Sequence, residues 1–222
     1  MVCNLETAEL IEVIDSHKQD EIIKTLMSWS LEQREAVTEV SVDMWGGFTK
    51  VIKTVFPNAR IVYDRFHVMK MLNKELNEIR KKCKNQLKNL KIKHIRNLIL
   101  KNRDDLKDED LKLLESILNC SQKLKNAYEL KEEFRKIYNT HQTPEVAKLK
   151  LEEWLKKAAK FYNQAIKSIK DHFEGICNYF YDRTTSGRME GINNKIKVIK
   201  RQAYGFTNFG HLRMRLLIAF SH

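Results

Sequence analysis

The sequence predicts an α/β fold with a large all-helical part. Two β-branched runs, at residues 37–43 and 60–64, flank a stretch at 48–56 with apolar residues at helical spacing. This order is typical of a strand–helix–strand unit, which implies a mostly parallel sheet. The 222 residues include seven glycines and two prolines, too few for most all-β folds. We therefore expect a small sheet accompanied by many helices.

The first 67 residues carry the predicted strands. Residues 10–15 form a short β-branched run, and residues 19–29 place apolar side chains at helical spacing. The strand at 37–43 ends at Asp43, and the strand at 60–64 ends at Asp64. Pro57 follows the intervening helix and stops it.

The rest of the chain is predicted to be helical. A long basic helix starts near Phe66 and runs towards Arg103. Residues 105–182 continue as helices, with a clear break at Thr143-Pro144. A further helix at 189–201, a turn at 204–206 and a last helix ending near Phe220 complete the chain.

The positive charge is concentrated in two blocks. The formal net charge is +12, yet residues 68–103 alone carry +10 and residues 183–222 carry +7. Clusters of this kind concentrate positive potential on limited surface, which favours a polyanionic partner. The alternative is that the basic helices only present solvated faces, as in a helical interaction protein.

Cysteine spacing and hydropathy exclude several other classes. The four cysteines are scattered, with no pair spaced for a zinc clip or a redox motif, and we expect reduced thiols. The apolar run 216–220 is too short to span a bilayer, and the start lacks a secretory signal. The sequence therefore predicts a cytoplasmic protein without a membrane partner.

Asp43 and Asp64 are the first candidate functional residues. Each ends a predicted strand, at the edge where parallel sheets place functional groups, and a carboxylate there suits Mg²⁺. The alternative is that either aspartate caps the following helix. His67 follows Asp64 by three residues, but without two further ligands this spacing is weak support for zinc.

The polar stretch at 184–197 contains the other candidate acid. Glu190 falls in the first turns of a helix that Ser186 can cap, and glycines at 187 and 191 allow close approach of a backbone or phosphate. Basic residues then alternate with the aromatic residues Tyr204, Phe206 and Phe209, as is typical of nucleic-acid binders. The plainer interpretation is a solvated basic helix with a single acid.

Two motif blocks resemble the DDE transposases of bacterial insertion sequences. The first is Asp43 with the stretch 56–68, which reads FPNARIVYDRFHV, and the second is the stretch 187–206, which begins GRMEGINNKIK. The resemblance implies an incomplete ribonuclease-H-like core interrupted by a helical insertion. Residues 1–67 would form part of the core, 68–182 the insertion, and 183–222 the helices that complete the core and carry the catalytic glutamate.

The resemblance also implies a chemistry. In that family three acids bind two Mg²⁺ ions for cleavage and strand transfer at a DNA phosphodiester. Asp43 would be the second acid and Glu190 the third, while Asp64 and His67 would form a supporting motif; Asp64 stays open as an alternative metal ligand. The family's first aspartate lies on an opening strand that this sequence lacks, and Asp15 is a poor substitute. We therefore expect an N-terminally truncated transposase that is inactive alone.

The expected partner is DNA, at the ends of an insertion sequence. The predicted contacts are basic residues of the two positive blocks: Arg80, Lys81, Lys82, Lys84, Arg188, Lys195, Lys197, Lys200 and Arg201. A homo-oligomer is left open. The alternative function is a non-catalytic, basic nucleic-acid-binding helical protein, in which the acids are only helix caps; metal binding that depends on Glu190 distinguishes the two.

Overall fold

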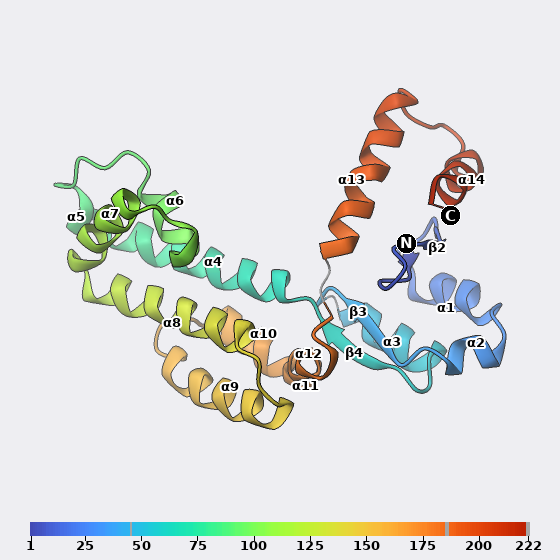
Figure 1. Cartoon of the computed structure of the whole chain (residues 1–222), viewed down its shortest axis with the longest axis horizontal. Coiled ribbons are helices and arrows are strands. Elements are labelled where there is room, and N and C mark those ends of the chain that lie inside the picture. Colours follow the sequence, from blue (N-terminus) through green and yellow to red (C-terminus); the bar gives the residue numbers. More distant parts are fainter. Residues whose placement is uncertain (45, 185–186, 221–222) are drawn as a thin grey trace. The chain divides into compact units, whose positions relative to one another are not determined.

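The chain forms two compact units, seen in the computed structural model in Figure 1. The structure describes residues 1–44, 46–184 and 187–220, except the side chain of Arg188. Unit 1 comprises residues 1–64 and 184–222, and unit 2 comprises residues 65–183. The fold is mostly helical with small sheets.

Unit 1 contains two small sheets. Strand β1 (Val2–Cys3) pairs antiparallel with β2 (Leu10–Glu12). Strand β3 (Glu39–Val42) pairs in parallel with β4 (Arg60–Tyr63), and Val42 lies opposite Tyr63. Helix α3 (Gly46–Val55) connects these two strands. The predicted strand–helix–strand unit with parallel strands is thus confirmed.

One core cluster of unit 1 lies between its first helices and β3–β4. Helix α1 (Gln19–Met27) packs on α3 and buries Ile22 and Leu26 against Val51, Ile52 and Val55. Helix α2 (Leu31–Glu35) was not predicted from apolar spacing. Its start is a capping box, in which the Ser30 side chain accepts from the Gln33 backbone and the Gln33 side chain accepts from the Ser30 backbone.

The second core cluster of unit 1 joins its C-terminal helices to β2. Helix α13 (Gly187–Gln202) and helix α14 (Phe209–Phe220) confirm the last two predicted helices. The cluster consists of apolar side chains from α13, α14 and the β2 region: Leu10, Val13, Ile192, Ile196, Ile199, Leu212, Leu216 and Phe220. Arg213 donates two hydrogen bonds to the Glu12 carboxylate, at 2.7 and 2.8 Å, which ties α14 to β2.

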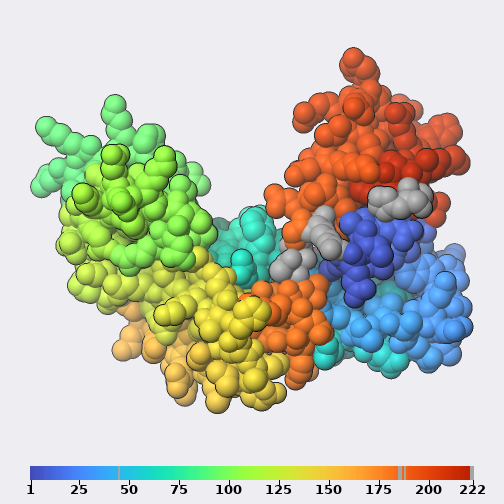
Figure 2. All heavy atoms as spheres, in the orientation of Figure 1, coloured from blue at the N-terminus to red at the C-terminus, as the bar shows by residue number. Residues whose placement is uncertain are grey.

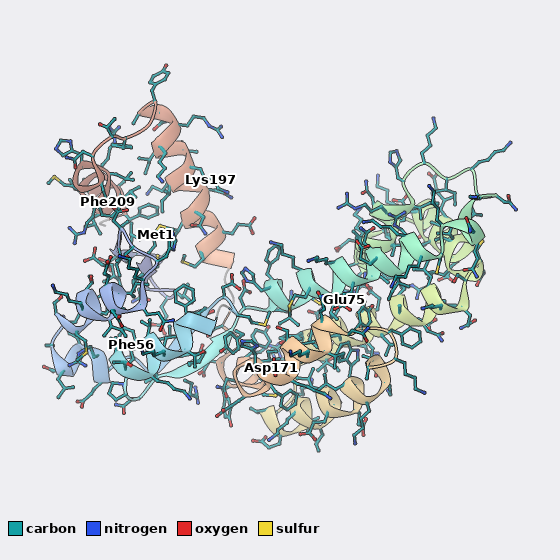
Figure 3. All side chains as sticks on the ribbon, turned by 180° about the vertical axis from the view of Figure 1, so that it is seen from behind. Met1, Phe56, Glu75, Asp171, Lys197 and Phe209 are labelled. Atoms are coloured by element: carbon teal, nitrogen blue, oxygen red, sulfur yellow. The ribbon has the colours of Figure 1, made fainter. Side chains whose placement is uncertain are left out.

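Unit 2 is built on two long helices, α4 (Arg65–Lys82) and α8 (Gln122–Asn139), which lie side by side. Helix α9 (Pro144–Ala158) packs on α8 and begins at the predicted break, where the Thr143 hydroxyl accepts from the Val146 backbone. Helix α10 (Gln164–Asp171) packs on α4. The Glu75 carboxylate of α4 (Figure 3) accepts from the backbone N–H groups of Asn163 and Ala165, which caps α10 from a neighbouring helix.

The prediction of one long helix from Phe66 to Arg103 is wrong. Helix α4 ends at Lys82, and α5 (Lys84–Leu87) and α6 (Ile95–Leu100) follow as separate pieces. Like charges at i,i+4, such as Arg80 with Lys84, weaken a continued helix, and burial of Leu98 and Ile99 requires α6 to fold back onto α4.

Four further helical elements of the described residues complete unit 2. They are the 3₁₀ turn η1 (Arg103–Asp105), α7 (Asp108–Asn119), α11 (Phe173–Cys177) and α12 (Tyr179–Asp182). The described part of residues 105–182 contains no strand, as predicted. All four cysteines are free. None of the described helices combines the length and the apolar character needed to cross a membrane.

Candidate functional site

Asp43 and Asp64 follow neighbouring strands at one edge of the parallel pair. Asp43 comes directly after β3 and Asp64 directly after β4, and the Asp64 N–H donates to the carbonyl of Val42 at 3.1 Å. Parallel neighbouring strands lie about 4.8 Å apart, so the two aspartates leave the sheet side by side. Asp43 is exposed, whereas Asp64 is only 8% exposed. The structure therefore brings together two predicted acids in different environments.

Glu190 occupies a separate position in the same unit. It lies in the first turn of α13, and its side chain is exposed. Within the described residues, no group of three or more His, Cys, Asp or Glu side chains is placed to hold a metal ion. Glu190 thus lies in a helix, as predicted, and is exposed, but within the described residues it does not form a three-residue metal group with the aspartates.

His67 belongs to a different unit from Asp64. The division between the units falls after Asp64, and His67 lies in the first turn of α4. Its ring packs edge-on against Phe66, with the ring centroids 5.7 Å apart. The three-residue spacing of Asp64 and His67 therefore spans two units.

The two carboxylates at the edge of the β3–β4 sheet, those of Asp43 and Asp64, are ligands of the type that Mg²⁺ prefers. Two carboxylates supply the hard oxygen ligands that this ion prefers, and Mg²⁺ is commonly held by one or two carboxylates while it keeps several waters. Asp43 is accessible for such an ion because its side chain is exposed. The chemistry of the residues is therefore compatible with a divalent cation at this edge.

Helix α13 has an apolar face and, opposite to it, a polar face. Its buried face carries Ile192, Ile196 and Ile199, which point into the second core cluster. The opposite face carries four exposed polar residues at spacings of three and four, Glu190, Asn194, Lys197 and Arg201, which we call the α13 stripe. Lys197 lies on the side of α13 away from α14 and donates to the Asn194 side chain at 3.5 Å (Figure 3).

The other predicted DNA contacts of α13 have different surroundings. Lys200 is exposed beside the stripe. Lys195 instead donates to the carbonyl of Ala219 and sits 4.3 Å from the centroid of the Phe220 ring, so it is engaged with α14. The side chain of Arg188 and the whole of Ser186, the predicted cap, lie outside the described residues.

The three aromatic residues after α13 do not share one environment. Phe206 and Phe209 are partly buried against the second core cluster, whereas the side chain of Tyr204 is fully exposed, at 102%. The sequence interpretation treated the three as one stacking surface. The structure corrects this, because two of the rings stabilise unit 1 and one is available at the surface.

A second basic surface lies at the α4–α6 end of unit 2. Arg80 donates to Asn77 at 2.9 Å and Lys81 to Glu78 at 2.8 Å, while Lys82 and Lys84 are exposed. Three further exposed lysines of the segment between α5 and α6 were not named from the sequence, although the block charge includes them: Lys88, Lys91 and Lys93. Side chains of this green segment stand out from the surface in Figure 2.

Comparison with known proteins gives a family for the chain. Residues 1–216 match the ISL3 family of DDE transposases, described as "Transposase". The transposase for insertion sequence element IS1001 of Bordetella parapertussis is 30% identical over 196 residues, which cover 84% of this chain. An ATP-dependent protease of Lactococcus lactis subsp. lactis is 33% identical over 57 residues, which cover 26% of this chain and 18% of that protein.

The match to the IS1001 transposase covers most of this chain but a smaller share of that relative. The aligned part is 48% of the IS1001 transposase, so this chain spans about half the length of that relative. No solved structure matches the chain. The family assignment therefore rests on the match that extends over almost the entire sequence.

Proposed function

The chain belongs to the ISL3 family of DDE transposases, and we propose that it acts in Mg²⁺-dependent DNA cleavage and strand transfer at the ends of an insertion sequence. The observation that carries this proposal is the pair of aspartates that follow β3 and β4 in a chain of this family. Parallel sheets present functional groups at this edge. The family match favours this function over a non-catalytic nucleic-acid-binding protein.

The proposal assigns a ribonuclease-H-like core to unit 1. Strands β3 and β4 with α3 would supply the part of the core that holds the aspartates, and α13 would supply the glutamate. Unit 2 would be the helical insertion, since it interrupts unit 1 between Asp64 and Thr184. Two chain segments far apart in sequence would thereby contribute to one site.

In the proposed site, Asp43 and Glu190 are the metal-binding acids. Both side chains are exposed, so both can reach a bound ion without rearrangement of a core. Asp64 is buried beside Asp43, and we assign it to support of the site. When bound, Mg²⁺ supplies charge stabilisation at the phosphodiester and lowers the pKa of the attacking group.

The proposed DNA contacts are basic residues, assigned in each unit by itself. On α13 these are Lys197, Lys200 and Arg201, and on unit 2 they are Arg80, Lys81, Lys82 and Lys84. Arg188 stays a predicted contact, whereas Lys195 is engaged with α14 and is left out of the set. Contacts with phosphate release counterions, so the affinity should fall steeply with salt. Fluorescence anisotropy of a labelled duplex across a salt series measures this slope.

Iron-directed backbone cleavage tests the metal site. Fe²⁺ in place of Mg²⁺, with ascorbate and peroxide, generates radicals that cut the chain close to the bound ion, and mass spectrometry maps the cuts. We expect cuts around residues 43 and 190 that are lost in Asp43→Asn and reduced in Glu190→Gln. Asp15→Asn changes an exposed acid of the same unit and is the matched control. Its backbone should be cut at the same places as that of the unaltered protein.

Two results would count against the assignment. Absence of site-directed cuts, or cuts that persist in both Asp43→Asn and Glu190→Gln, would remove these residues from the metal site. Loss of the cuts in Asp64→Asn with normal cutting in Asp43→Asn would transfer the metal-binding role to Asp64.

A further inference from the structure

Tyr204 combines an unusual backbone with an unusual exposure. Its φ is +53°, in the left-handed region that residues other than glycine and asparagine rarely adopt, and Gly205 follows with φ +102°. The side chain is 102% exposed, so no packing within the described part of unit 1 explains a tyrosine at this position. Strained positions that carry no packing role are candidates for function.

The turn that carries Tyr204 is held at both ends. The Gly205 N–H donates to the Lys200 carbonyl and the Tyr204 N–H to the Arg201 carbonyl, both at 3.1 Å. This is the Schellman pattern, in which the left-handed position occupied here by Tyr204 is usually glycine. At the other end, the Asn208 side chain accepts from the His211 N–H at 3.1 Å and caps α14. The backbone below the exposed ring is therefore well defined.

The ring stands at the end of the α13 stripe. The stripe begins at Glu190, continues through Asn194 and Lys197, and reaches Arg201, three residues before Tyr204. At 1.5 Å per residue the distance from Glu190 to the turn is about 20 Å, which matches about six stacked nucleotides at 3.4 Å each. Cations followed by an exposed aromatic ring are the combination that binds single-stranded nucleic acid, through phosphates and a stacked base.

We propose that Tyr204 stacks on an unpaired nucleobase of a DNA strand that runs along the α13 stripe. The inference rests on the proposed function, because it takes DNA as the ligand and adds the single-stranded state of that DNA. Charge complementarity favours DNA as the occupant, since Lys197, Lys200 and Arg201 are exposed on or beside the stripe. Phe206 cannot share this role because it packs against the second core cluster.

The test uses the 222-residue chain with a short labelled single-stranded oligonucleotide and the duplex of the same sequence. We expect Tyr204→Gly to weaken single-strand binding by about tenfold, as for removal of one stacked base, and to change duplex binding by less than about twofold. Tyr204→Phe keeps the ring and should bind as the unaltered protein does. Met214→Ala, at a residue of α14 that is 61% exposed, is the control for a general loss of exposed apolar surface.

The thermal midpoint distinguishes stacking from a structural role. Glycine adopts the left-handed backbone without steric cost, so Tyr204→Gly should melt at the same or a higher temperature. A clearly lower midpoint, or single-strand binding equal to that of the unaltered protein, would overturn the inference. So would a change of oligomeric state in Tyr204→Gly with single-strand binding intact, because the ring would then contact a second copy of the chain.

The same binding experiment gives a different result if the proposed function, and not only the stacking inference, is wrong. If the unaltered chain binds neither the single strand nor the duplex at low salt, DNA binding itself is refuted, and the stacking inference falls with it. If the unaltered chain binds both and Tyr204→Gly binds both equally well, only the stacking inference is wrong.

Discussion

Unit 2 buries large polar and aromatic side chains, whereas most of the candidate functional residues of unit 1, Asp64 excepted, lie at the surface. The largest fully buried side chains of the described residues, among them Trp154, Tyr128 and Tyr162, all lie in unit 2. In unit 1 the candidate residues Asp43, Glu190, Lys197 and Arg201 are exposed. The two units therefore differ in where their polar chemistry lies.

Three buried polar groups of unit 2, those of Trp154, Tyr162 and Lys131, have partners inside the unit. Trp154 Nε1–H donates to the Leu130 carbonyl at 2.8 Å, and the Tyr162 hydroxyl donates to the Ala127 carbonyl at 2.6 Å. Lys131 is fully buried, and its ammonium donates to the carbonyl of Lys101 at 2.9 Å. The difference teaches that substitutions of these buried groups in unit 2 should report stability, whereas substitutions on the unit 1 surface should report function.

Loss of the buried lysine should have the largest effect on stability. Lys131 Nζ also donates to the Ile99 carbonyl at 3.3 Å and pairs with Glu132 at 2.8 Å, so it satisfies the end of α6 and neutralises an acid. Lys131→Met leaves those groups without their cation and should lower the free energy of unfolding by about 3 kcal/mol. Urea denaturation measures this change.

An exposed lysine of the same helix is the control for that measurement. Lys123→Met should change the free energy of unfolding by less than about 0.5 kcal/mol, because the side chain is at the surface. Equal effects of the two substitutions would contradict the contrast between buried and exposed polar groups.

A pair of tyrosines tests the same contrast at a smaller scale. Tyr162→Phe removes a buried hydroxyl that has a defined acceptor and should cost about 1 kcal/mol. Tyr204→Phe removes a fully exposed hydroxyl and should leave the free energy of unfolding unchanged. If Tyr204→Phe lowered the free energy of unfolding as much as Tyr162→Phe does, the exposure of the hydroxyl would not explain its contribution to stability.

The smallest expected effect concerns the ion pair of unit 1. Hydrogen bonds from Arg213 lower the pKa of Glu12, so the folded state holds this carboxylate ionised at a lower pH than the unfolded chain does. Its contribution to stability is present above the ordinary pKa of glutamate and is lost as the pH falls through the folded value. Arg213→Gln should cost about 0.5 kcal/mol at neutral pH, reduced by solvent because Arg213 is 42% exposed.

The pH series supplies the check. The difference in unfolding free energy between Arg213→Gln and the unaltered protein should vanish in strongly acidic solution, because Glu12 is then protonated in both proteins. A difference that stays constant across the acidic range would indicate that Arg213 acts through packing instead of charge.

Much of unit 1 could be predicted because its patterns are local. The alternation before Asp43 and the β-branched run before Asp64 each require a few residues, and the connecting helix favours parallel pairing. The side-by-side position of the two aspartates follows from that pairing. The start of α9 was equally predictable, since Thr143 and Pro144 are a local helix start.

Other features depended on contacts between distant residues. The end of α4 is set by the packing of α6 back onto it, and the state of Lys131 by carbonyls about thirty residues away in the chain. The engagement of Lys195 with Ala219 also joins separate helices. A basic residue in a sequence looks the same whether it faces solvent or a carbonyl, so composition alone could not separate these cases.

The sequence by itself determined the family, the two acids at the strand ends and the two basic blocks, because each is written in neighbouring residues or in a motif. Only the tertiary structure decided which basic and aromatic side chains remain accessible. Phe206 and Tyr204 are two residues apart and chemically similar, yet one packs on a core and the other is fully exposed. The reason is that burial is a property of the surfaces brought together by folding, which the local order of residues does not specify.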